Sequence, residues 1–206
     1  MADWKTHLYC ANRVNETFDL KGKELDQFLF GSLLPDVNMG WVITPEVTLA
    51  QDVTHFDEIG QEYFWAPLRF YEKYKADIDS KNPLYLGYLF HLWLDVSIMA
   101  DFVSRVSMSD MINNYHDVRQ WKWKDLDLFI KDYKYELSVE YIDDIINQSK
   151  NIEEVQITKG DLLSIVDYIN TFEINADYDY FVYTEQELAD FYEKICLDFI
   201  KWTKNI

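Results

Sequence analysis

The chain has 206 residues, of which 49% are hydrophobic and 17% aromatic, so it can bury one sizeable core within a single domain. Its formal net charge of −18 opposes approach to nucleic-acid phosphates and to anionic membranes, so we expect no nucleic-acid partner and no stable membrane association. With 6 glycines and 4 prolines the chain is too poor in turn residues for a β sandwich, and we predict an all-α fold.

Two helices and a long loop are predicted before residue 54. The first helix covers Trp4–Val14, and the second covers Leu25–Leu34, with apolar side chains along one face. Pro35 should end the second helix, because proline disfavours helix in the residue before it. Asp36 would then lie just past the helix end. Residues 37–53 predict a loop, and loops of that length inside compact domains are often functional.

A central helix is predicted from Leu84 to about Val106. Asn82 is expected to cap it and Pro83 to occupy its first turn. The segment is apolar nearly all round, which is typical of a helix in the middle of a bundle. Its length would suit a membrane span, but His91 and Asp95 in its middle argue against one.

The remaining segments complete a bundle of roughly seven or eight helices. Thr184 and Glu187 form a capping-box pattern before the last helix. We predict one helical domain over residues 1–206, with a metal-site half at about 1–135 and a C-terminal helical extension at about 136–206. The other expected helices lie within residues 60–79, with Pro67 in a first turn, 121–134, 138–148 and from Thr158 onward.

Metal-ligand residue types recur through the first half of the chain. His91 and Asp95 are four residues apart, so a helix carries both on one face, where they can share one ion. A buried carboxylate or imidazole is costly without a partner, and a metal would supply that partner. Further residues of these types lie in three separate segments, as His7, Asp36 and His55.

Each of these residues also has an ordinary structural interpretation. A single histidine on an apolar face is usually a core residue bonded to a backbone carbonyl, and an aspartate after proline usually caps or turns the chain. Several such residues on separate elements, however, match the way helical bundles build metal sites. Imidazole and carboxylate without a suitably spaced cysteine pair favour zinc with a position left for water.

The segments that carry these residues resemble the zinc-dependent phospholipase C family, whose fold is shared with single-strand-specific nucleases. The resemblance covers roughly the first hundred residues and implies hydrolysis of a phosphoester by a zinc-activated water. It further implies that His55, His91, Asp36 and Asp95 hold the first zinc, and that His7 completes this shell or bridges toward a second ion. The matching segments, in the family's order, are His7, the Gly-x-x-x-Pro-Asp segment Gly31–Asp36, the Thr-His-Phe segment Thr54–Phe56, and the Gly-Tyr-x-x-His-x-x-x-Asp segment Gly87–Asp95.

The chain departs from that family in its second half. Secreted phospholipases of this kind use the amine of a mature N-terminus as a ligand, and here no signal segment is expected to create one. The family's later His-x-x-x-Glu pair is also absent, because the only later histidine is His116 and Gln120 stands four residues on. One zinc is therefore expected, and a second would need His116, Asp117 or Asp125.

The leading hypothesis is a cytoplasmic, metal-dependent hydrolase of a small phosphoester, with Asp36 and Glu58 as candidate catalytic carboxylates. An HD-type phosphohydrolase is the enzymatic alternative, because His116–Asp117 is a His-Asp dipeptide. A non-catalytic module, in which the metal braces a helical surface for a protein partner, is the third hypothesis. A metal site open to solvent would favour an enzyme, whereas a site closed beneath Trp41 or Trp65 would favour the module.

Overall fold

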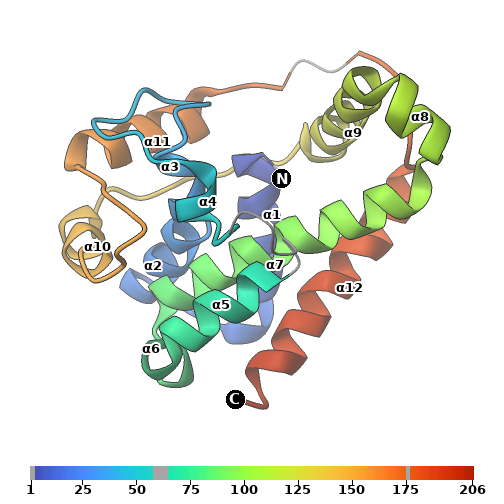
Figure 1. Cartoon of the computed structure of the whole chain (residues 1–206). Helices are drawn as coiled ribbons and strands as arrows, with labels where there is room; N and C mark the ends of the chain where they lie inside the picture. Colours follow the sequence, from blue (N-terminus) through green and yellow to red (C-terminus); the bar gives the residue numbers. More distant parts are fainter. Residues whose placement is uncertain (1–2, 58–64, 175–176) are drawn as a thin grey trace.

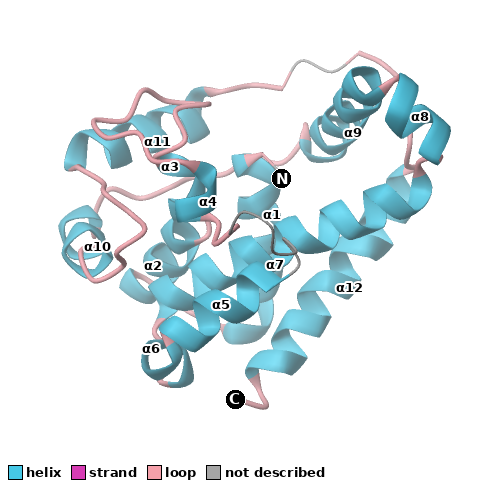
Figure 2. Ribbon diagram, in the orientation of Figure 1, coloured by secondary structure: helices cyan, strands magenta, loops and turns pink. Residues whose placement is uncertain are grey.

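A computed structural model describes residues 3–57, 65–174 and 177–206 (Figure 1). These residues form twelve helices and no strand, which confirms the predicted all-α bundle (Figure 2). Eight helices have at least eight residues, and the short ones divide segments that the sequence pattern treats as continuous. The helices are α1 (Trp4–Phe18), α2 (Lys23–Gly31), α3 (Leu34–Val37), α4 (Gln51–Thr54), α5 (Ala66–Lys73), α6 (Lys75–Asp79), α7 (Pro83–Arg105), α8 (Met108–Asn113), α9 (Tyr115–Ile130), α10 (Ile142–Ser149), α11 (Lys159–Thr171) and α12 (Glu185–Thr203).

Helix α7 is the central element, and α2, α5 and α12 pack along it (Figure 1). It begins as predicted, with the Asn82 side chain accepting a hydrogen bond from the Leu84 amide and Pro83 in the first turn. It is long and apolar enough to cross a membrane, but 61% of its most apolar stretch is buried inside the protein. The central helix of a soluble bundle has the same properties, so these features alone do not indicate a membrane span.

Two glycines bring the backbones of α2 and α7 into direct contact. A Cβ atom on Gly31 would overlap the Leu84 carbonyl, and one on Gly87 would overlap the Phe28 carbonyl. The obstructing atoms belong to backbone, so they cannot move aside as a flexible side chain could. The contact places the C-terminal end of α2 beside His91, one helical turn after Gly87.

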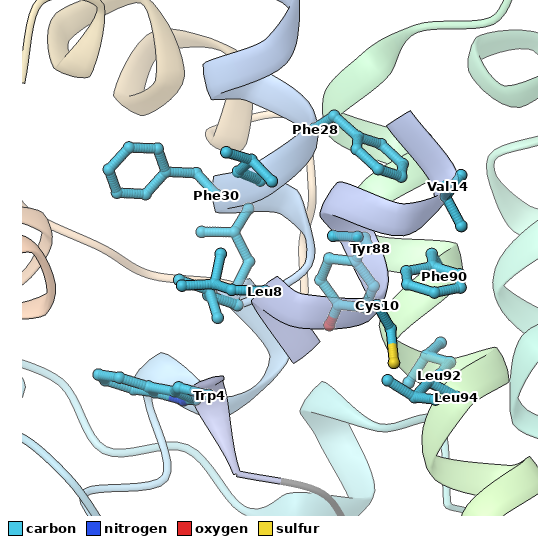
Figure 3. Close-up of a cluster of buried hydrophobic side chains, with 14 of the residues drawn as sticks. Trp4, Leu8, Cys10, Val14, Phe28, Phe30, Tyr88, Phe90, Leu92 and Leu94 are labelled. Atoms are coloured by element: carbon cyan, nitrogen blue, oxygen red, sulfur yellow. The ribbon is translucent and has the colours of Figure 1, made fainter. Parts of the chain in front are cut away.

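The core is one continuous cluster of buried apolar side chains that extends from α1 to α12. In Figure 3, Leu8 and Val14 of α1 lie in the same cluster as Phe28 of α2 and Phe90 of α7. Cys10, on α1, and Cys196, on α12, are both free and buried. The Cys196 thiol donates to the Cys10 carbonyl oxygen at 3.5 Å, which is one of the contacts that join α12 to α1.

The two helix starts expected in the second half follow from local capping. Thr158 and Asp161 bond reciprocally at the start of α11, and Thr184 and Glu187 do so at the start of α12. Each pair satisfies two backbone N–H groups that a helix start leaves without partners. The predicted capping box at Thr184 is confirmed.

The predicted end of the second helix is wrong. Helix α2 ends at Gly31, and Pro35 lies in the first turn of a separate short helix, α3, which also contains Asp36. Proline has no N–H group, and the first turn of a helix needs none there, so Pro35 fits a helix start as well as a position after a helix end. Asp36 is consequently held on a helical turn rather than in a loop.

The helix predicted over residues 121–134 is displaced toward the N-terminus. Helix α9 covers Tyr115–Ile130, and the additional helix α8 precedes it, capped by the Ser107 hydroxyl on the Asp110 amide. The displacement arises because residues 107–120 are largely polar and lack a continuous apolar face, so periodicity alone does not reveal their helical structure.

Candidate metal centre

Five histidine and aspartate side chains converge from four separate elements at the centre of the bundle. His7 comes from α1, Asp36 from α3, and His55 from the residue that ends α4, whereas His91 and Asp95 come from α7. All five are buried, and Asp36 is the most exposed of them at 6%. The structure therefore brings together the five potential metal ligands that the sequence predicts in its first half.

One half of the centre surrounds the Nε2 atom of His91. This nitrogen lies 3.2 Å from His55 Nε2, 3.6 Å from Asp95 Oδ2 and 3.9 Å from Asp36 Oδ1. His55 Nε2 in turn lies 3.3 Å from Asp36 Oδ1. His55, His91 and Asp36 thus form one group of potential ligand atoms, at separations that a shared cation would account for.

His7 closes the other side of the centre. Its ring stacks on that of His91, with centroids 3.8 Å apart and planes 5° from parallel. His7 Nε2 lies 3.4 Å from Asp95 Oδ1. The two oxygens of Asp95 therefore face different histidines, so this carboxylate joins the group His7, His91, Asp95 to the group Asp36, His55, His91.

The orientation of His91 is set by a backbone carbonyl. Its Nδ1 lies 2.8 Å from the carbonyl oxygen of Ser32, which can only accept, so Nδ1 carries the proton of the neutral ring. Burial lowers the pKa of His91 to about 3, so the ring is neutral at physiological pH. Nε2 consequently presents a lone pair to the centre, as a metal-ligating imidazole does.

His55 is oriented by the hydroxyl of its neighbour in sequence. Its Nδ1 lies 2.8 Å from Thr54 Oγ1, and that oxygen lies 3.5 Å from the sulfur of Met39. With the hydroxyl donating to sulfur, Nδ1 of His55 donates to the hydroxyl oxygen and Nε2 is left with a lone pair. Two lone pairs, on His55 and His91, then face each other at 3.2 Å, an arrangement that a cation between them would stabilise.

The two carboxylates of the centre are held in their charged form. Burial alone would raise the pKa of Asp36, but the neighbouring His91 and His55 outweigh burial and lower it. Burial also opposes ionisation of Asp95, yet His7 and His91 are among the groups that hold its pKa well below the usual value. Two negative charges are thus buried among imidazole rings, where a cation would offset them.

Several atoms of the centre lack a partner with hydrogen-bond geometry in the part of the chain that the structure describes. They are Asp36 Oδ1 and both ring nitrogens of His7. Buried acceptors without partners are unfavourable, typically by about 1–3 kcal/mol each. His7 and Asp36 belong to different groups of potential ligands, and a metal ion bound in either group would satisfy one of them, so the residues present fit a metal with nitrogen and oxygen ligands.

The shared use of His91 limits how many ions the centre can hold. Both groups of potential ligands include His91, and its Nδ1 is already bonded to Ser32. A single ring nitrogen has one lone pair and can ligate one ion only. Two ions could therefore not both bind His91, so an ion held by His91 would take its other ligands either from His7 and Asp95 or from Asp36 and His55.

The residues predicted to complete a second site lie elsewhere. His116 and Asp117 are exposed on α9, where His116 Nε2 lies 2.8 Å from the Gln120 side chain. Neither belongs to a group of potential metal ligands among the described residues, so the geometry gives no support to an HD-type centre built on this dipeptide. Glu58 lies outside the described residues.

Asp125 is buried, but it stabilises a loop. Its carboxylate accepts hydrogen bonds from the backbone amides of residues 181, 182 and 183, at 2.7, 2.6 and 2.9 Å. These bonds fix the segment that leads into α12. The carboxylate is thereby occupied, and Asp125 does not join the metal centre.

Two contributors to the centre were not identified from the sequence. The Ser32 carbonyl and the Thr54 hydroxyl orient imidazole rings, and both residues adjoin or lie within the motif segments that contain the ligands.

Comparison with known proteins assigns this chain to no family. No family model matches it, and neither a curated protein nor a solved structure does. The phospholipase C resemblance therefore rests on the four short segments.

Proposed function

We propose that this chain is a metal-dependent hydrolase of a small phosphoester, with one zinc ion held by His55, His91, Asp36 and Asp95 and completed by His7. The observation that carries the proposal is the convergence of five buried imidazole and carboxylate side chains with acceptor atoms left unpartnered. Zinc accepts this set of nitrogen and oxygen ligands, polarises a phosphoryl oxygen, and lowers the pKa of water from about 15.7 toward about 7.

Some residues of the chain would bind the metal ion, and others would orient the ligands that bind it. Ser32 and Thr54 fix the imidazole rings of His91 and His55, so that both Nε2 lone pairs face the ion. Asp36 is the ligand nearest to solvent, and its Oδ1 lacks a partner with hydrogen-bond geometry. We therefore assign Asp36 to the side from which the ester approaches, where its carboxylate can also accept a proton from the attacking water.

The phosphoester class comes from the resemblance in four segments, because the ligand set alone specifies only a metal. The net charge of −18 argues for a small ester rather than a polyanion or an anionic lipid surface, since the field of the protein repels both.

A second candidate function is a metal-braced interaction module. It is favoured by the enclosure of the centre, since no ligand is more than 6% exposed. Trp41 and Trp65 are 54% and 53% exposed, so they are available to a protein partner. In this alternative the metal contributes stability and no chemistry.

One experiment separates the two candidates. Elemental analysis gives the metal content per chain, and a panel of nitrophenyl phosphoesters is then assayed after chelation and after zinc or manganese is added back. Asp36→Asn tests the centre, and Asp117→Asn is the matched control on an exposed aspartate. The hydrolase proposal expects metal-dependent turnover that Asp36→Asn abolishes and Asp117→Asn retains.

Turnover that survives exhaustive chelation would exclude the proposed mechanism. Stoichiometric metal without turnover on any ester, combined with a loss of melting temperature on chelation, would identify the metal as a structural brace.

A further inference from the structure

The sequence contains two cysteines, and the fold brings them together. Cys10 lies near the middle of α1 and Cys196 near the middle of α12, at opposite ends of the chain. The Sγ atom of Cys196 lies 3.5 Å from the carbonyl oxygen of Cys10, on two helices that pack against each other. Both are free thiols. The two thiols of the molecule therefore meet at one place in the core.

The two side chains are close enough for a disulfide to form between them. A disulfide spans two Cα atoms that are about 4.4–6.8 Å apart. The contact between Cys196 Sγ and the Cys10 carbonyl oxygen, together with standard bond lengths, limits the separation of their Cα atoms to about 9 Å at most. Closing the bond therefore needs the two helices to approach by about 2 Å or less.

The two thiols differ in how easily an oxidant in solution can reach and oxidise them. Cys10 is fully buried, among the apolar side chains of Figure 3, whereas Cys196 is 4% exposed. Burial raises the pKa of the Cys10 thiol, and the neighbouring Cys196 raises it further. A thiol that stays protonated is a poor nucleophile toward a dissolved oxidant. Cys196 is therefore the residue that should react first, with Cys10 as the thiol beside it.

We propose that Cys10 and Cys196 are a thiol oxidation site, at which a peroxide converts the pair into a reversible disulfide that joins α1 to α12. The Cys196 sulfur attacks one peroxide oxygen, the O–O bond breaks, and hydroxide leaves with the thiol proton as water. The Cys10 sulfur then attacks the sulfur of the resulting sulfenic acid, the S–O bond breaks, and a second water leaves. The two thiols together lose two electrons and two protons, and one peroxide is reduced to two waters. A small thiol reverses the bond by exchange.

The bond would close a loop that contains most of the chain. A cross-link restricts the unfolded chain more strongly as the loop becomes longer, so it stabilises the folded protein. Helix α1 also carries His7, one turn before Cys10, so the bond would restrict the movement of one potential metal ligand. The inference does not rest on the proposed function, because neither a metal nor an ester takes part in the oxidation.

The test compares the reduced and the peroxide-treated full chain, both after chelation. Intact mass, thiol titration and non-reducing electrophoresis follow the bond, and a peptide map locates it. We expect the wild type to lose two hydrogen atoms and both titratable thiols, and to migrate as a monomer. Its melting temperature should rise by about 5 °C or more on oxidation and return to the reduced value in dithiothreitol.

Two matched variants separate the roles of the thiols. Cys10→Ala keeps the thiol that should react first, so dimedone should trap a sulfenic acid at Cys196 after peroxide treatment. Cys196→Ala keeps only the buried thiol, which should still titrate as a thiol once the protein is unfolded. Neither variant can form the internal bond, so neither should show the rise in melting temperature.

Three outcomes would overturn the proposal. The first is that both thiols of the wild type still titrate after a treatment that converts free cysteine fully to cystine. The second is that oxidation links two copies of the chain instead of two helices of one copy. The third is a melting temperature that falls on oxidation, because the bond would then strain the fold instead of stabilising it. If an alanine variant fails to fold, the comparison of oxidised and reduced wild type still decides all three.

Discussion

Replacement of His91 by alanine should remove both the metal and a large part of the stability of the fold. The side chain is fully buried, stacks on His7 and donates to the Ser32 carbonyl. The substitution leaves a core cavity of the kind that typically costs about 3–5 kcal/mol. It also leaves a buried carbonyl without its partner, which typically costs about 1–3 kcal/mol.

These two contributions overlap, because the surrounding side chains relax into the same space. We therefore expect the metal-free variant to lose about 3–5 kcal/mol, or roughly 6–20 °C in melting temperature for a chain of this size. With zinc present at about a thousand times its dissociation constant, the wild type should gain a further ~4 kcal/mol that the variant cannot gain.

The assay is thermal unfolding in chelator and in excess zinc, with elemental analysis of the same samples. His116→Ala is the control, because it removes an exposed histidine whose ring contacts Gln120 on α9. That variant should stay within about 0.5 kcal/mol of the wild type and keep its metal. If His91→Ala retained the wild-type metal content and melting temperature, the assignment of the centre would be wrong.

Three further predictions follow from the same structure. Gly87→Ala should destabilise the fold by about 1–3 kcal/mol or more and weaken metal binding, because its Cβ would overlap the Phe28 carbonyl. Denaturant unfolding measures the loss. The control is Gly160→Ala, whose stability should be close to that of the wild type because its Cβ would make only an ordinary contact at 3.6 Å. In the metal-free protein, the free energy of unfolding should fall as the pH is lowered from about 6.5 toward 3, by up to about 1.4 kcal/mol per pH unit. The reason is that the pKa of His91 is about 3 in the folded state, so the unfolded chain takes up the proton first. Urea titrations at several pH values should show this slope in the wild type and not in His91→Ala. The lowered pKa values of Asp36 and Asp95 act in the same direction below about pH 4, so a stability that rises on acidification would contradict the assigned environments. Binding to single-stranded DNA and to anionic vesicles should be negligible at about 0.15 M salt, and micromolar binding by the metal-free protein in a sedimentation or anisotropy assay would show that a local basic patch outweighs the net charge of −18.

The elements that the sequence predicted correctly are those decided by neighbouring residues. Asn82 with Pro83, and Thr184 with Glu187, act within one turn of the helix that they start, so their patterns are visible in a short window. Pro35 was misassigned because proline is compatible with both a helix start and the end of the preceding helix. That choice depends on how α3 packs, which no short window contains.

In the metal centre, too, features decided by neighbouring residues could be predicted and features decided by tertiary packing could not. His91 and Asp95 could be placed on one helix face from their spacing, but the approach of His7 depends on the packing of α1 between α12 and the bundle centre.

The wide spacing of the ligands along the chain has a consequence for folding kinetics. His7 must be brought to His91 and Asp95, or Asp36 and His55 to His91, through contacts distant in sequence before an ion can bind either group of ligands. A transition state that lacks part of this arrangement gains little from the ion, whereas the native state gains all of it. A metal ion bound there should therefore slow unfolding far more than it accelerates folding, and its removal should shorten the lifetime of the native state more than it delays folding.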